Sequence, residues 1–182
     1  MNFCLLVVGA LTVLSVGAAE LKIGLIGLDT SHVIAFTELI NNPTNNNHVP
    51  GGKVVVAFKG GSPDIESSRS RVEGYTKTLQ EKYGVRIVPT IEELCREVDV
   101  VMLTSVDGRP HLEQARPVIA AKKPLFIDKP LAGSLKDAVM IFKLCEEAKV
   151  PVFSSSSYRY YESLTALKKE DIGELKGAIS YG

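Results

Sequence analysis

The stretch LKIGLIGLDTSHV, residues 21–33, decides the fold. Its mostly apolar start predicts a buried strand over 21–26, Gly27 then allows a tight turn, and a helix follows over 33–40. A strand, a glycine turn and a helix in this order are typical of the phosphate-binding unit of a doubly wound sheet, with the pattern GxGxxG. Asp29 and His32 stand at the second and third glycine positions. Whether this turn holds a dinucleotide is the question that the sequence raises.

Composition narrows the classes of protein and partner. The chain has 182 residues, 45% of them apolar, and 21 basic residues balance 21 acidic ones. This composition predicts a globular protein with a real core, and the charge balance favours no nucleic-acid partner. Cys95 and Cys145 lie in helix-like segments and are expected to be buried thiols, with a disulfide left open as an alternative. Three histidines without paired spacing predict no metal site.

The first nineteen residues have the pattern of a secretory signal. An apolar run over 3–16 precedes the small residues Gly17, Ala18 and Ala19, which predicts cleavage after Ala19 and a periplasmic or extracellular location. The run is shorter than a membrane-spanning helix, so we expect no stable membrane insertion after removal. A short membrane anchor and a misassigned start codon remain alternatives.

Apolar runs and helical periodicities alternate after the signal. The expected strands cover 21–26, 53–58, 85–88, 98–103, 125–127 and 150–153. The expected helices cover 33–40, 62–83 with Ser62 as cap, 91–98, 109–121 and 134–148, and Thr90 with Glu93 predicts a capping box. Strands that alternate with helices over short loops indicate βαβ units. We therefore predict an α/β, Rossmann-like doubly wound parallel sheet over 20–153.

The first turn permits two interpretations of Asp29. A carboxylate in place of glycine would repel a diphosphate, although Thr30, Ser31, His32 and the helix amino terminus still offer donors to an anion. In the other interpretation, Asp29 caps the helix by accepting from the N–H of Ser31 or His32. Lys59 ends the second strand, where it suits a 2′-phosphate, so NAD and NADP both stay open; an exposed surface lysine is the alternative.

A later segment resembles a known family. Residues 99–138, DVVMLTSVDGRPHLEQARPVIAAKKPLFIDKPLAGSLKDA, are similar to the core of the Gfo/Idh/MocA family of glucose–fructose oxidoreductases and inositol dehydrogenases. Members have an apolar strand, a polar turn, a histidine that opens a helix, a second apolar strand and Glu-Lys-Pro. Here the histidine is His111 and the triplet is Asp128-Lys129-Pro130. The resemblance runs over about 21–182 and departs from the family in the GLDTSH loop and in the aspartate of the triplet.

The resemblance implies an NAD- or NADP-dependent oxidoreductase that acts on a sugar-like or cyclitol hydroxyl. Lys129 is then the catalytic residue that contacts the substrate hydroxyl, and the Lys129–Pro130 peptide is expected to be cis. Asp128 and Pro130 are expected beside the cofactor. Thr104 and Ser105 are expected to meet its phosphates or nicotinamide ribose. His111 either lies by the cofactor or packs within the fold.

The last segment, 154–182, resembles the connecting helix and first strand of the family's second α/β domain. We therefore expect an amino-terminal portion that is inactive by itself, whose open sheet edge favours association and a possible homo-oligomer. The alternative function is an exported Rossmann-like binding module without a functional dinucleotide site, which recognises a saccharide or a partner protein.

Overall fold

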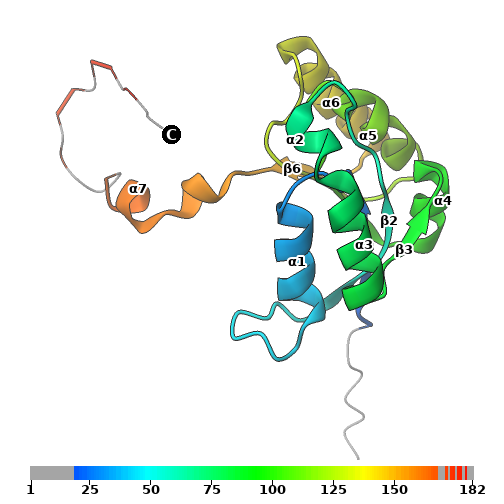
Figure 1. Ribbon diagram of the computed structural model, residues 1–182. Coiled ribbons are helices and arrows are strands. Elements are labelled where there is room, and N and C mark those ends of the chain that lie inside the picture. Colours follow the sequence, from blue (N-terminus) through cyan, green and yellow to red (C-terminus); the bar gives the residue numbers. More distant parts are fainter. Residues whose placement is uncertain (1–18, 168–170, 172, 175, 178, 180–182) are drawn as a thin grey trace, which may run out of the picture.

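Six parallel strands form one sheet in the computed structural model (Figure 1). The structure describes residues 19–167, 171, 173–174, 176–177 and 179, so the expected signal lies outside the described residues except for Ala19. The strands are β1 Leu21–Ile26, β2 Gly52–Phe58, β3 Arg86–Val88, β4 Val100–Leu103, β5 Leu125–Ile127 and β6 Val152–Ser154, in the order β3-β2-β1-β4-β5-β6. The predicted doubly wound Rossmann-like sheet is confirmed.

The register brings the carboxyl ends of the strands to one level. Ile26 at the end of β1 pairs with Phe58 of β2 and with Leu103 of β4, and Leu103 pairs in turn with Ile127 of β5. The segments that leave these strands therefore start from a common edge, where a ligand can contact several of them.

Helices cover both faces of the sheet (Figure 1). Helices α1 (His32–Asn41) and α3 (Val72–Tyr83) pack on one face, and α4 (Ile91–Glu97), α5 (His111–Ala120) and α6 (Leu135–Ala148) pack on the other. Alternate strand residues supply the two cores: Val101 and Leu103 face α4 and α5, whereas Val100 and Met102 face the side of α1.

The helix expected over 62–83 is two helices, α2 (Glu66–Arg69) and α3. Ser62 does not cap a helix: its N–H donates to Ser68 Oγ at 2.7 Å, and its hydroxyl donates to Asp107 at 2.7 Å. The bonds of Ser62 to Ser68 and Asp107 fold the segment before α3 back on itself. Local periodicity does not indicate such tertiary bonds. The predicted capping box is half formed, because Thr90 accepts from the N–H of Glu93 while the Glu93 carboxylate binds Arg86.

Cys95 and Cys145 are free and buried, as expected, and the structure does not join them. Burial raises the pKa of the Cys95 thiol to about 11 and also raises the pKa of Cys145. These thiols are core residues.

One part of the sheet carries an exposed apolar surface. A hollow on the face of α1 is lined by Phe36, Met102, Phe126 and Phe153, and the Phe126 and Phe153 rings lie 5.0 Å apart. Phe153 is 64% exposed. We call Phe36, Met102, Phe126 and Phe153 the apolar face.

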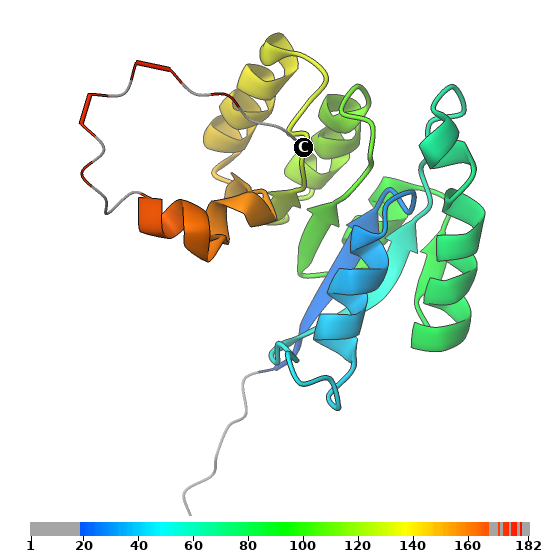
Figure 2. The same cartoon turned by 60° about the vertical axis from the view of Figure 1, so that its left-hand side comes forward.

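The chain leaves β6 through a 3₁₀ turn (Ser157–Tyr160) and the short helix α7 (Glu162–Leu167), which lead away from the sheet (Figure 2). The strand expected after this helix falls partly on residues that the structure does not describe, so it stays a prediction. Among the described residues, no helix has the length and apolar character needed to cross a membrane.

Candidate active site

The predicted site residues gather at the carboxyl edge of the sheet. They lie on the segments 27–31, 59–65, 104–110 and 128–134, which follow β1, β2, β4 and β5, or they open the next helix. From β1 the chain adds β2 and β3 on one side and then β4, β5 and β6 on the other, so the strand order reverses between β1 and β4. Ligands of doubly wound sheets bind at such a switch point.

Gly27 makes the predicted tight turn. Its φ is 86°, and a Cβ at this position would lie 2.1 Å from Ser105 Oγ. A Cβ on Gly60 would likewise lie 3.2 Å from the Cα of Gly27. The segments after β1, β2 and β4 therefore touch at Gly27, and only a residue without a side chain allows this approach.

Asp29 is fully buried and does not cap α1. One carboxylate oxygen accepts from Ser68 Oγ at 2.6 Å, and the other accepts from the N–H of Val106 at 3.0 Å. The capping interpretation is therefore wrong, because tertiary donors outcompete the local ones. The side chain joins the first turn to the segments after β2 and β4.

The amino terminus of α1 presents donors to the edge of the sheet. Thr30 Oγ1 accepts from the N–H of His32 at 3.3 Å, and Ser31 is exposed. Within the described residues, the structure gives the N–H groups of Thr30 and Ser31 no hydrogen-bond partner. Free amides at a helix start favour an anion such as a phosphate.

His32 and Asp128 form a pair. His32 Nδ1 lies 2.5 Å from Asp128 Oδ2, and the other Asp128 oxygen accepts from the N–H of Lys129 at 2.8 Å. The His32 side chain is 34% exposed, whereas that of Asp128 is 5% exposed. Two of the three positions that depart from the family pattern, His32 in the first turn and Asp128 in the triplet, are thus in direct contact.

Lys129 follows the buried Asp128 and is itself exposed. The Lys129–Pro130 peptide is cis, as the resemblance implied. The next residue, Leu131, offers its carbonyl oxygen to His111 Nδ1 at 3.1 Å. Lys129 therefore projects from a segment that is fixed on both sides by hydrogen bonds.

Thr104, Ser105 and His111 are tied into the fold. Thr104 Oγ1 donates to the carbonyl oxygens of Ile26 and Gly27, and Ser105 Oγ donates to Gln114 at 2.8 Å. The fully buried His111 ring places Nε2 at 2.9 Å from the Ser105 carbonyl. Of the two roles considered for His111, the structure gives it packing within the fold, between the segments after β4 and β5.

Lys59 lies at the end of β2, where its ammonium group binds Glu73 of α3. Both side chains are exposed. A groove beside them is lined by Lys59, Gly60, Pro110 and Gln114. Lys59 is therefore placed at this groove, paired with a carboxylate.

Sequence patterns missed a polar bridge between the segments after β2 and β4. Asp107 accepts from Ser62 and from Arg109, and Arg109 also binds Asp64. Arg109 holds the pKa of Asp107 at about 2, well below its usual value, with help from Ser62. No local motif marks these residues, because Ser62 and Asp107 lie 45 positions apart.

A family model described as "Oxidoreductase family, NAD-binding Rossmann fold" matches residues 21–156. The chain belongs to the Gfo/Idh/MocA family. Its NAD-binding Rossmann domain covers most of the described residues. No curated protein matches the chain.

Solved structures share this Gfo/Idh/MocA fold at low sequence identity. A dehydrogenase from Clostridium difficile has 18% identity and a TM-score of 0.61; the matched region covers 82% of this chain and 43% of the dehydrogenase chain. An oxidoreductase from Agrobacterium radiobacter, in complex with NAD+, L-tartaric acid and magnesium, has 21% identity and a TM-score of 0.64, with 86% and 42% covered. A myo-inositol dehydrogenase from Lactobacillus casei, in complex with NAD(H) and myo-inositol, has 22% identity and a TM-score of 0.59, with 82% and 40% covered. The chain thus spans about two fifths of the length of these structures.

The residues at the edge of the sheet fit NAD. The free amides of Thr30 and Ser31 suit a diphosphate, and the groove beside Lys59 and Gly60 lies at the end of β2, where the adenosine ribose binds in Rossmann domains. The Asp29 carboxylate is engaged by Ser68 and Val106. Among the described residues, no three His, Cys, Asp or Glu side chains converge as metal ligands.

Proposed function

We propose that this chain is the cofactor-binding part of an NAD-dependent oxidoreductase that moves hydride between the nicotinamide and a carbon bearing a hydroxyl group. The observation that carries the proposal is the meeting of two features at one edge: the free amides at the start of α1, and the exposed Lys129 held by its hydrogen-bonded segment. The first suits a phosphate and the second suits a substrate oxygen.

Each residue then has a defined task. When bound, NAD supplies the hydride acceptor. Lys129 donates a hydrogen bond to the substrate oxygen and stabilises the negative charge that develops there as the hydride departs. Asp128 fixes the main chain at Lys129 through the N–H of that residue. The His111 ring holds Leu131 and so fixes the other side of the same segment.

A sugar-like or cyclitol substrate is the finer part of the proposal. The relatives' structures with myo-inositol and L-tartaric acid support a polyhydroxylated molecule. We further propose that this portion is inactive without a substrate domain, that residues 1–19 direct export, and that the mature protein associates into homo-oligomers.

A second function is favoured by one observation. Asp29 and the Ser62–Asp107–Arg109–Asp64 bridge join the segments after β1, β2 and β4 at the edge where a dinucleotide binds in a doubly wound sheet. An exported binding module that has lost its cofactor would retain such internal bonds.

Fluorescence titration of the purified chain with NADH and NADPH separates the two functions. The oxidoreductase proposal expects NADH to bind. It expects NADPH to bind more weakly, because the ion pair with Glu73 already engages the Lys59 ammonium group that would otherwise meet a 2′-phosphate. If neither dinucleotide binds, the binding-module function is favoured.

A further inference from the structure

We infer that His32 and Asp128 form an acid–base pair in which His32 Nε2 exchanges the proton of the substrate hydroxyl. The inference rests on the proposed function. In the oxidising direction, the carbon–hydrogen bond breaks and its electron pair leaves as hydride to the nicotinamide. The oxygen–hydrogen bond breaks, its electron pair forms the carbonyl, and the proton goes to Nε2.

The first argument is the geometry of the pair. An ionised carboxylate only accepts hydrogen bonds, so Asp128 Oδ2, 2.5 Å from His32 Nδ1, keeps a proton on Nδ1. The neutral ring then carries its lone pair on Nε2. A buried carboxylate that fixes the tautomer of a partly exposed histidine is the arrangement by which proteins turn imidazole into a base.

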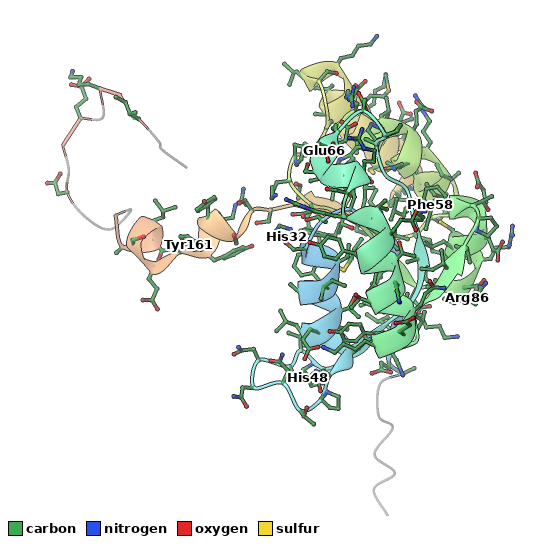
Figure 3. All side chains as sticks on the ribbon, in the orientation of Figure 1. His32, His48, Phe58, Glu66, Arg86 and Tyr161 are labelled. Carbon is green, nitrogen blue, oxygen red and sulfur yellow. The ribbon has the colours of Figure 1, made fainter. Side chains whose placement is uncertain are left out.

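The second argument is location. His32 opens α1 directly after the first turn, and Asp128 directly precedes Lys129. Figure 3 shows His32 at the end of α1 that lies at the carboxyl edge of the sheet, with His48 at the opposite end of that helix. Within the described residues, the structure gives His32 Nε2 no hydrogen-bond partner. The free nitrogen therefore belongs to the same edge as Lys129.

His32 and Asp128, which both depart from the family pattern, contact each other. A histidine replaces a glycine of the phosphate loop, and an aspartate replaces the longer glutamate of the triplet. The carboxylate of Asp128 meets the ring at position 32 at 2.5 Å. A base on the cofactor domain would supply the proton transfer that hydride transfer from an alcohol requires.

Diethyl pyrocarbonate tests the inference, because it labels unprotonated imidazole nitrogens. His48 is a matched control: it is also partly buried, and its Nδ1 lies 3.0 Å from the carbonyl oxygen of Leu39, a neutral acceptor. With the 182-residue chain and mass-spectrometric detection, we expect His32 to be labelled faster than His48 and His111 to be labelled last. Asp128→Asn should change the labelling rate of His32 and leave that of His48 unchanged. Asp128→Glu, which keeps the carboxylate, should retain most of the rate.

Equal labelling of His32 and His48 in the unmodified chain would overturn the inference, as would a His32 rate that is indifferent to a folded Asp128→Asn variant. NAD+ should protect His32 and not His48. If NADH binds in the fluorescence titration and NAD+ gives no protection, His32 lies outside the site and the inference fails while the proposed function stands. If NADH does not bind but the Asp128 effect is seen, the proposed function fails and the proton-transfer role of His32 fails with it, although the pairing of His32 with Asp128 is supported.

Discussion

Lys129 is the residue that the proposed function assigns to the reacting oxygen. In that proposal its ammonium group acts on the oxygen that becomes negative, so it should contribute more to the transition state than to cofactor binding. In a form that carries a substrate domain, Lys129→Ala should lower kcat by about a hundredfold, the usual loss for one charged donor in such a site. Steady-state kinetics give kcat, and NADH fluorescence should show an unchanged affinity. An active enzyme that tolerates Lys129→Ala would refute the assignment.

Asp29 is a residue whose effect is on stability. Asp29→Ala leaves the Ser68 hydroxyl and the Val106 N–H without their buried acceptor, at about 1–3 kcal/mol for each group. Asp29→Asn keeps one acceptor and should lose less. Urea unfolding of the three proteins measures the order, which should be wild type, Asn, Ala. Equal free energies of unfolding for the Asn and Ala variants would contradict the bonds described for Asp29.

At the scale of elements, β1 and α4 are in contact through a glycine. A Cβ at Gly24 would lie 2.6 Å from Leu94 Cδ2, and Leu94 is fully buried. Gly24→Ala should therefore destabilise the fold by about 1–3 kcal/mol through overpacking. Gly74, on the exposed surface of α3 with no atom within 4 Å of its Cβ position, is the matched control. Gly74→Ala should stabilise by about 0.5–1 kcal/mol, since alanine favours helices. Thermal unfolding should move in opposite directions for the two variants.

Elements were predictable where local pattern and tertiary packing agree. Buried parallel strands read as apolar runs, so β1, β2 and β5 lie where the sequence placed them, β2 with one added residue. The helix expected over 62–83 failed because Ser62 bonds to Ser68 and to Asp107, and Ser68 bonds to Asp29. For the site, the tight turn at Gly27 and the cis Lys129–Pro130 peptide followed from motifs. The pairs Asp29–Ser68 and His32–Asp128 did not, because residues 39 and 96 positions apart meet only in three dimensions.

At the scale of the whole molecule, two carboxylates with lowered pKa values are expected to contribute to stability in acid. Hydrogen bonds from Tyr83, Asn42 and Lys82 hold the pKa of Glu38 at about 2, and Arg109 does the same for Asp107. A carboxyl whose folded pKa is depressed contributes its full stability above its unfolded pKa, here about 4–4.5. That contribution is lost as the pH falls toward 2. Melting temperatures measured from pH 6 to pH 2 should fall below pH 4.5, and less steeply for Asp107→Asn. Identical slopes for both proteins would exclude Asp107 as a cause.

The apolar face also belongs to this scale. Exposed clusters of large apolar side chains promote association and bind hydrophobic dyes. Phe153→Ser should weaken both dye fluorescence and self-association on gel filtration with light scattering. Leu135→Ser, which removes an 81% exposed leucine on α6 away from this face, is the control and should change neither. A dye signal unaltered by Phe153→Ser would show that this face is not the binding surface.

The buried His111 ring lies between the segment after β4 and the segment that carries Lys129, and it can bind either of them. Its nitrogens face two carbonyl oxygens, Ser105 on the cofactor side and Leu131 beside Lys129. A neutral imidazole carries one N–H, so while the ring is neutral it can donate to only one of these oxygens at a time. Each tautomer therefore donates to one of the two segments, either the segment after β4 or the segment that carries Lys129. The segment whose carbonyl oxygen does not accept this hydrogen is then left without a hydrogen bond from the ring.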